Sequence, residues 1–315
     1  MKIALLDDYL STARAAADWG RLGSAEVVSF ERPFGSVDAA AAALAGFEVV
    51  VAMRERTTLD AALIGRLPDL RLIVTTGMRN ASIDMAAARA AGIDVCGTEM
   101  LPTPTAELAW GMIIALARRI PEQQASLRAG GWQVALGTAL AGKRLGLLGL
   151  GKLGGQMARI GAAFGMEPVA WSPNLTEERA RAAGARRVEK DDLFAGSDVV
   201  SVHLVLSERS RGIVSAADIA RMKPSAVFVN TSRAGLVDQE ALGAALRDGR
   251  IAGAGIDVFD TEPLPSGDPI LAWPNTVLTP HLGYVTQETW RLAYGQALED
   301  VEAWAKGAPV RLLNG

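Results

Sequence analysis

Short apolar runs alternate with alanine-rich segments along the chain, and this alternation limits the possible folds more than any other feature. In the first hundred residues the runs are KIALLDD, EVVSF, FEVVVAM, RLIVTT and IDVC. Such runs are typical of strands that are buried on both faces, as in a parallel sheet. Helices are expected between them, around residues 11–19, 37–45, 59–67 and 83–91. The pattern predicts an α/β domain with helices on both faces of a parallel sheet.

A second series of the same kind begins at Arg144, with the runs RLGLLGL, PVAW, DVVSVHL, AVFVN, AGAGIDV and TVLTP. A longer apolar segment joins the two series. It is expected to be a helix with Thr103 as its N-cap and Pro104 at its first position. Another helix is predicted over 286–306. The sequence therefore predicts an α/β protein with two doubly wound parallel-sheet domains.

Composition narrows the class of protein. A chain of 315 residues can bury two cores, and its net charge of -3 gives no electrostatic reason to expect a nucleic-acid or membrane partner. The opening MKIALLDDYL is too short an apolar run for a signal peptide, and no stretch of about 20 apolar residues suggests a membrane span. The single Cys96 provides neither an internal disulfide nor a metal framework. A cytoplasmic enzyme without a metal is expected.

A glycine-rich turn opens the second series. Gly149, Gly151 and Gly154 form the pattern G-x-G-x-x-G after a strand-like run and before a helical segment. The first glycine permits a tight turn, the second lets the backbone approach a pyrophosphate, and the third allows close packing of the helix. The free N–H groups at the helix N-terminus also favour phosphate. This context predicts a dinucleotide site.

The acidic residue that usually binds the ribose of NAD is missing. The strand-like run PVAW should deliver it, but Ser172, Pro173 and Asn174 follow instead. Without a carboxylate to repel a 2′-phosphate, NADP is permitted, although Arg179 and Arg181 lie further along. The coenzyme is therefore expected to be NAD or NADP, with a slight preference for NADP or dual use.

Polar side chains follow the later runs of the second series. Because the carboxyl ends of parallel strands meet at one edge of a sheet, these residues are expected to converge there. Taken singly, each could be an ordinary surface charge or a structural residue, and His203 is expected to be structural or to flank the cofactor. The residues are His203, Thr231, Ser232, Arg233, Asp257, Glu262, Thr279 and His281.

The chemistry of three of these side chains fits one reaction. Arg233 can bind a carboxylate bidentately and polarise a neighbouring carbonyl. His281 can exchange a proton near neutral pH, and Glu262 can fix its tautomer and favour the imidazolium. A fourth, Asp257, could accept from the nicotinamide carboxamide. We therefore expect hydride transfer between a nicotinamide and a carbonyl beside a carboxylate.

Four segments of the chain resemble successive signatures of the D-isomer-specific 2-hydroxyacid dehydrogenase family, in its order and near its spacing. They are LLGLGKLGGQMA, VNTSRAGLVDQEAL, GAGIDVFDTEPLP and TPHLGY. The segment DVVSVHLVLSERSRGIV also resembles the family, with Val205 where proline is common. The similarity is close over about 100–300 and loose before it.

The resemblance implies roles for individual residues and an arrangement of domains. It implies a flavodoxin-like substrate domain from 1–100 and 285–315, and an inserted Rossmann domain, 101–284, that binds the cofactor. It also implies a homodimer built largely on the inserted domain. The catalytic residues would be Arg233, Glu262 and His281, with cofactor contacts from Lys152, Leu153, Thr231, Asp257 and the backbone around Val205 and Gly283.

The chain departs from the family pattern at Ser172 and in the loop TTGMRNASID, which replaces a commoner glycine-rich loop that meets the substrate carboxylate. Gly77, Met78 and Arg79 are expected to contact the substrate there. We hypothesise that Arg79 binds a second anionic group on the substrate or the cofactor phosphate.

The expected reaction is the reversible reduction of a small 2-oxo acid, such as glyoxylate, hydroxypyruvate or pyruvate, to its D-2-hydroxy acid. No C-terminal regulatory domain is expected after residue 315, which disfavours the longer phosphoglycerate dehydrogenases. Formate or phosphite oxidation on the same scaffold is one alternative. A non-catalytic binding protein that senses a dinucleotide is another.

Overall fold

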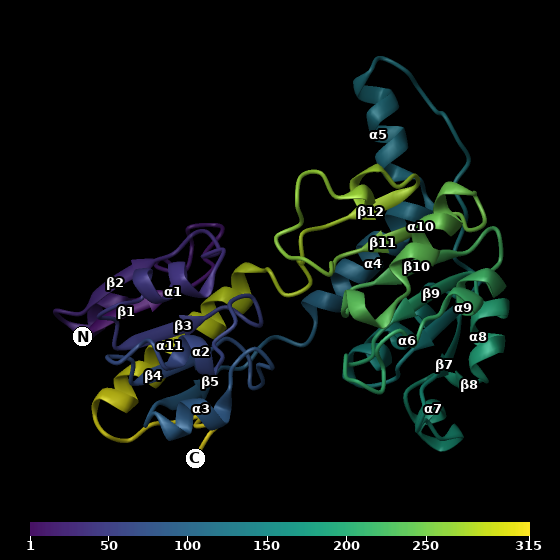
Figure 1. The fold of residues 1–315 in the computed structure, drawn as a ribbon. Coiled ribbons are helices and arrows are strands. Elements are labelled where there is room, and N and C mark those ends of the chain that lie inside the picture. The colour runs from purple at the N-terminus through teal and green to yellow at the C-terminus, as the bar shows by residue number, and fades with distance from the viewer. The chain divides into compact units, whose positions relative to one another are not determined.

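The computed structural model describes all residues, 1–315, and they form two compact units (Figure 1). Unit 1 combines Met1–Leu101 with Val285–Gly315, and unit 2 is Pro102–Tyr284. None of the helices has the length and apolar character needed to cross a membrane.

Unit 1 is built on five parallel strands in the order β2-β1-β3-β4-β5. This is the order of flavodoxin-like sheets. The strands are β1 (Lys2–Leu5), β2 (Glu26–Ser29), β3 (Val49–Ala52), β4 (Leu72–Thr75) and β5 (Asp94–Gly97).

Helices cover this sheet because alternate strand residues point to opposite faces. One face packs against α1 (Val37–Ala43), α2 (Ala61–Ile64) and α3 (Met85–Ala90) in a single apolar core. The long C-terminal helix α11 (Gln287–Ala305) lies against β4. Each of the four helices begins at a residue whose side chain accepts a backbone N–H of the first turn, namely Ser36, Asp60, Asp84 and Thr286.

The helix predicted over 11–19 is wrong. This segment forms turns, followed by the short 3-10 helix η1 (Trp19–Leu22). The Asp8 carboxylate accepts the N–H groups of Thr12 and Ala13, and the buried Trp19 indole donates to the carbonyl of Ala13. The bond from Trp19 occupies a carbonyl that would accept an N–H within a helix, so this local side-chain contact competes with the helical propensity of the alanines.

Unit 2 is built on seven parallel strands in the order β12-β11-β10-β9-β6-β7-β8. Counted within the unit, this is the doubly wound Rossmann order, which reverses between β6 and β9. The strands are β6 (Arg144–Leu148), β7 (Glu167–Trp171), β8 (Arg186–Arg187), β9 (Val199–Val202), β10 (Val227–Asn230), β11 (Gly253–Ile256) and β12 (Thr276–Leu278).

Two apolar cores cover the two faces of this sheet. One contains residues of α4 (Pro104–Ala117), α6 (Lys152–Ala163) and α7 (Glu177–Ala182). The other contains residues of α8 (Lys190–Gly196), α9 (Ala216–Arg221) and α10 (Gln239–Arg247), and of the 3-10 helices η2 (Ala234–Leu236) and η3 (Pro269–Ala272). The prediction of two parallel-sheet α/β domains is confirmed.

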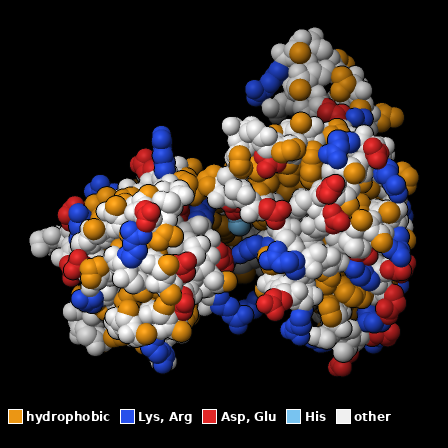
Figure 2. Space-filling view, in the orientation of Figure 1, with side chains coloured by type: hydrophobic (Ala, Val, Ile, Leu, Met, Phe, Trp, Pro, Cys, Tyr) orange, Lys and Arg blue, Asp and Glu red, His pale blue; other side chains and the backbone are white.

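Helix α4 begins at Pro104 as predicted, but the Thr103 side chain makes no capping hydrogen bond. After α4, helix α5 (Ile120–Arg128) buries none of its residues and stands out from the rest of unit 2 (Figure 1). Hydrophobic side chains are visible on this projecting part (Figure 2). The large exposed apolar residues of α5 and the segment around it are Ile120, Leu127, Trp132, Val134 and Leu136.

Candidate active site

The carboxyl edge of the seven-stranded sheet brings the expected residues of unit 2 together. All seven strands are parallel, so the residues that follow them lie along one edge. In the order of the strands this edge carries His281 after β12, Asp257 after β11, Arg233 after β10, His203 after β9 and Gly149 after β6. Because the strand order reverses between β6 and β9, ligands of such sheets bind at this point.

The glycine-rich turn has the geometry of a phosphate cradle. Gly149 has φ 103°, and a Cβ there would lie 2.6 Å from the carbonyl oxygen of His203. A Cβ on Gly154 would lie 2.2 Å from the carbonyl oxygen of Gly149. At Gly151, by contrast, no atom lies within 4 Å of the Cβ position. Two of the glycines therefore permit internal close packing, while the middle one leaves room for a ligand.

The N-terminus of α6 fits a dinucleotide phosphate at this position. Gly151 is its N-cap and, having no side chain, leaves the first-turn N–H groups uncapped. Nearby along the same edge, the Thr231 hydroxyl is buried without a hydrogen-bond partner. An orphaned buried hydroxyl is what a missing ligand contact would leave. These residues fit a bound NAD-type cofactor.

His203 is unsuited to proton transfer. Both of its ring nitrogens are buried without partners. Burial lowers the pKa of His203 to about 3, so the imidazole is neutral at physiological pH. This agrees with its expected role as a structural or cofactor-flanking residue.

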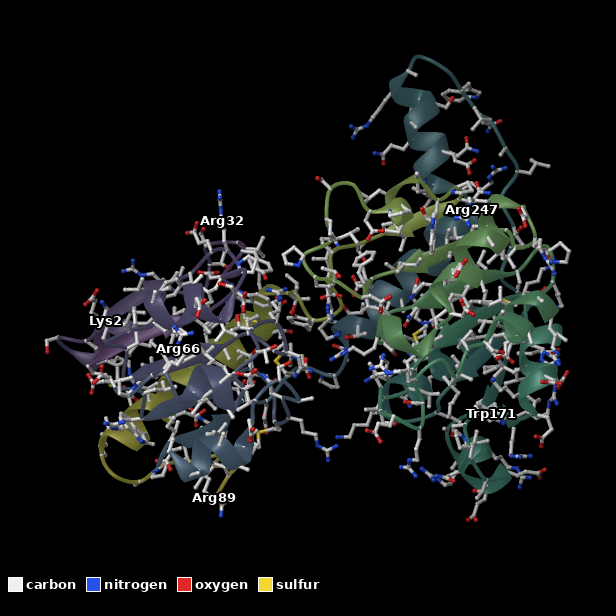
Figure 3. All side chains as sticks on the ribbon, viewed as in Figure 1. Lys2, Arg32, Arg66, Arg89, Trp171 and Arg247 are labelled. Carbon is white, nitrogen blue, oxygen red and sulfur yellow. The ribbon has the colours of Figure 1, made fainter.

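The strand that would deliver a ribose-binding acid ends without one. Trp171, labelled in Figure 3, is the last residue of β7, and the half-buried Ser172 follows it. Asn174, Arg179 and Arg181 are exposed beyond it. The end of β7 therefore presents the Ser172 hydroxyl where NAD-binding domains usually present a carboxylate, with the Asn174 amide exposed two residues further on.

His281 and Glu262 form a close pair. The imidazole Nδ1 lies 2.6 Å from Oε2 of Glu262, and Oε1 accepts the backbone N–H of Phe259 at 2.9 Å. Burial alone would raise the pKa of Glu262. The hydrogen bond and charge of His281, the Phe259 N–H and the charge of Arg233 outweigh burial and lower it. The carboxylate is thus ionised beside the imidazole ring.

Asp257 is fully buried and binds the loop that carries His281. Its carboxylate accepts the Thr279 hydroxyl at 2.5 Å and the backbone N–H groups of Leu282 and Gly283 at 2.7 and 2.9 Å. Burial raises the pKa of Asp257 despite these bonds and the nearby charge of His281. The carboxylate therefore holds the loop on both sides of the histidine. A cofactor contact of Asp257 stays a prediction.

Arg233 projects from a loop that is fixed by side-chain hydrogen bonds. The buried Asn230 donates to the carbonyl of Arg233 and accepts the N–H of Ser232, at 3.0 Å each. The Ser232 hydroxyl donates to the carbonyl of Val202 at 2.8 Å. This network couples the ends of β9 and β10 and holds the backbone of the arginine in place.

Other predicted residues have simpler surroundings. Lys152 is exposed and Leu153 half-buried in the first turn of α6. Val205 is 83% exposed, and its carbonyl accepts the Ser210 hydroxyl. Gly283 is buried. The cofactor contacts expected of these residues stay predictions.

In unit 1, the expected substrate loop follows β4. Met78 and Arg79 are exposed, and Gly77 has φ 111°. A Cβ on Gly77 would lie 2.0 Å from Nη1 of Arg54, whose guanidinium donates to the carbonyl of Thr76. Gly77 is therefore favoured for its backbone conformation, while a Cβ there would require the end of the flexible Arg54 side chain to move.

Sequence reasoning did not assign the contacts made by Arg54 and Phe259. Arg54 directly follows the run FEVVVAM, so its position after a strand could have pointed to it. Phe259 acts through its backbone N–H, which no residue type reveals. The sequence predicts Thr279 at the sheet edge but does not reveal its hydrogen bond to Asp257.

Comparisons with known proteins agree with this geometry. Residues 110–283 match the family model of the D-isomer specific 2-hydroxyacid dehydrogenase NAD binding domain. A glyoxylate reductase from Aeropyrum pernix is 37% identical over 267 residues, which are 81% of this chain and 80% of that protein. A D-3-phosphoglycerate dehydrogenase from Archaeoglobus fulgidus is 35% identical over 269 residues. These are 84% of this chain, which spans only about half of that relative, 51% of its length.

Among solved structures, a phosphoglycerate oxidoreductase from Vibrio cholerae has a TM-score of 0.92 and is 36% identical, with 98% of this chain and 100% of that one covered. Both units therefore share the fold of these dehydrogenases. The chain belongs to the D-isomer-specific 2-hydroxyacid dehydrogenase family, NAD-dependent oxidoreductases that act on the CH–OH group of their donors.

Proposed function

We propose that the protein interconverts a small 2-oxo acid and its D-2-hydroxy acid. The observation that carries the proposal is the 2.6 Å pair of His281 and Glu262 at the carboxyl edge of the sheet that holds the dinucleotide cradle. A general acid of this kind must lie where the substrate carbonyl meets the nicotinamide.

Each of the three polar side chains has a separate task in this proposal. Arg233 binds the substrate carboxylate and polarises the 2-oxo group. His281 gives its proton to the developing alkoxide in reduction and takes it back in oxidation. Glu262 holds the ring by Nδ1, which leaves Nε2 for that proton. The bound coenzyme supplies or accepts the hydride.

The residues proposed to hold the coenzyme lie at the glycine-rich turn and along the carboxyl edge of the same sheet. The backbone at Gly149, Gly151 and Gly154, with Lys152 and Leu153, would bind the pyrophosphate, and Ser172 would lie at the ribose. Thr231, Asp257, and the backbone at Val205 and Gly283 would complete the site. Family membership supports NAD, and the absence of an acid at 172 supports use of NADP or of both coenzymes.

Glyoxylate, hydroxypyruvate and pyruvate are the proposed substrates. The similarity to a glyoxylate reductase favours the first two. We also propose that Gly77, Met78 and Arg79 contact the substrate, and that Arg79 binds a second anionic group on the substrate or the cofactor phosphate. Unchanged Michaelis constants for both substrate and coenzyme in Arg79→Ala would exclude that role of Arg79.

The proposed functional form is a homodimer built on unit 2. Helix α5 and the segment after it expose large apolar side chains, including Trp132 at 74% and Leu136 at 95%. Exposed apolar patches of this kind mark association surfaces. Light scattering should give a dimer for the wild type and a monomer for Trp132→Ser/Leu136→Ser, whereas an unchanged dimer would place the interface elsewhere.

A matrix of acids and coenzymes tests the proposed reaction. Glyoxylate, hydroxypyruvate, pyruvate and 3-phosphohydroxypyruvate are each combined with NADH and NADPH, and formate and phosphite with the oxidised coenzymes, followed by nicotinamide absorbance. Turnover of a 2-oxo acid at enzyme-like rates supports the proposal. Turnover of formate or phosphite alone favours that alternative, and coenzyme binding without any turnover favours a dinucleotide sensor.

A further inference from the structure

We propose that Thr105 is a positioning residue for the reaction, which fixes the proton-donating His281 through the peptide of Gly283. The inference rests on the proposed role of His281 and assigns a task to a side chain outside the catalytic three. Every residue in the argument belongs to unit 2.

The backbone of His281 needs external support. Its φ is 54°, in the left-handed region that side chains other than glycine rarely occupy. Such a conformation persists only where surrounding contacts hold it. The direction of the imidazole follows from this backbone, so the contacts that hold the backbone also aim the ring.

Asp257 provides part of this support. Its Oδ1 accepts the Thr279 hydroxyl and the Leu282 N–H, and its Oδ2 accepts the Gly283 N–H. The carboxylate thus fixes residues on both sides of the histidine. It leaves the carbonyl of Gly283 to another partner.

Thr105 is that partner. Its hydroxyl donates to the Gly283 carbonyl at 2.8 Å. The fit is close, because a Cβ on Gly283 would lie 3.2 Å from Oδ2 of Asp257 and 3.2 Å from both Cγ2 and Oγ1 of Thr105. Asp257 therefore binds the N–H of Gly283 and Thr105 binds its carbonyl, two residues after His281.

Thr105 lies in the first turn of helix α4, which is packed against the sheet. The helix buries Ala109, Trp110 and Ile113 and lies against β10, β11 and β12. These are the strands that precede Arg233, Asp257 and His281. The bond also joins the two segments by which the chain enters unit 2 after Leu101 and leaves it after Tyr284. The Thr105–Gly283 hydrogen bond thus attaches the loop that carries His281 to the helix that packs on β10, β11 and β12.

Thr103 offers a matched control at the start of the same helix. It is exposed, and its side chain makes no capping bond. The change Thr103→Val therefore repeats the chemical change of Thr105→Val two residues away without touching Gly283. Thr105→Ser keeps the hydroxyl, and Thr105→Ala removes it without adding apolar bulk.

The experiment compares these four variants by steady-state kinetics and by NMR of the histidine rings. The chain has only two histidines, so the His281 and His203 signals are separated by a single His281→Ala spectrum. We expect Thr105→Val and Thr105→Ala to lower kcat about 10- to 100-fold with the KM values little changed, since small misplacement of a reacting group has effects of this size. We expect Thr105→Ser and Thr103→Val to resemble the wild type.

In the spectra, loss of the Thr105 hydroxyl should shift or broaden the His281 ring signal and leave that of His203 unchanged. An unaltered His281 signal in both Thr105→Val and Thr105→Ala overturns the inference, as does equal impairment by Thr105→Ser. An effect confined to the coenzyme KM also overturns it. The NMR measurement needs no turnover. It therefore tests whether Thr105 positions His281 even if none of the 2-oxo acids is reduced in the substrate matrix.

Discussion

Nδ1 of His281 lies 2.6 Å from one oxygen of Glu262, while the other oxygen accepts the N–H of Phe259. The carboxylate is thereby anchored to the backbone and fixes the imidazole in turn. With Nδ1 engaged, Nε2 is the nitrogen free to exchange a proton with substrate. The pair has the arrangement of a base and its orienting group in other acid–base enzymes.

Replacing the carboxylate should weaken catalysis. Glu262→Gln loses the ionised oxygen that holds Nδ1 of His281, so we expect kcat for reduction to fall about 10- to 100-fold while coenzyme affinity is retained. Steady-state rates and coenzyme titration check this, with the exposed Glu240→Gln as control. An unchanged kcat would mean that Glu262 does not orient the catalytic ring.

The two glycines of the cradle should respond differently to alanine. Gly149→Ala puts a Cβ 2.6 Å from a backbone oxygen at φ 103°, so we expect a loss of about 1–3 kcal/mol in the free energy of unfolding. Gly151→Ala meets no atom within 4 Å and should leave that free energy nearly unchanged while raising the coenzyme KM. Urea unfolding and coenzyme titration measure both. A Gly151→Ala protein with normal coenzyme affinity would argue against phosphate binding at this turn.

Ser172 should control the choice of coenzyme. Ser172→Asp introduces the carboxylate that accepts from ribose hydroxyls and repels a 2′-phosphate. We expect kcat/KM with NADPH to fall about tenfold or more, while kcat/KM with NADH is maintained or rises. The ratio of the two constants, measured with one 2-oxo acid, is the test. An unaffected ratio would show that residue 172 does not meet the ribose.

Asp300 should make the stability of unit 1 depend on pH. Burial raises its pKa from 3.8 to about 7, although the adjacent Arg311 lowers it. Between about pH 4 and 7 the unfolded chain ionises and the folded carboxyl does not, so the free energy of unfolding should fall as pH rises. The shift corresponds to roughly 4 kcal/mol at most. Urea unfolding at pH 5 and 8 should show a smaller difference for Asp300→Asn, but not for the exposed Asp69→Asn.

Much of the architecture could be predicted because apolar runs report burial directly. Each predicted strand region contains a strand, since a strand covered on both faces has few polar residues. The two-residue β8 escaped prediction because Arg186 and Arg187 carry no apolar signal. The helix expected over 11–19 does not form, and there the Trp19 indole binds the Ala13 carbonyl that a helix would use. A side-chain contact of this kind leaves no trace in local propensity.

For the candidate site, topology allowed the edge to be predicted but not the contacts. Arg233, Asp257 and His281 lie at one edge because each follows a parallel strand within three residues, so this placement does not depend on the detailed loop conformations. The bond between Glu262 and His281 was expected from their chemistry, yet its length depends on the loop after β11. The hydrogen bonds of Thr105 and Asp257 to Gly283 involve its backbone groups. Every residue has such groups, so residue types could not predict these bonds.

The most direct test of the account is the rate of 2-oxo acid reduction by His281→Ala under saturating coenzyme. We predict that the wild type reduces at least one of glyoxylate, hydroxypyruvate and pyruvate, and that kcat falls at least about 100-fold in the variant, since a positioned general acid contributes about 10²- to 10⁴-fold. Coenzyme affinity should be retained. A variant that turns over as fast as the wild type would contradict the assignment of His281 as the proton donor.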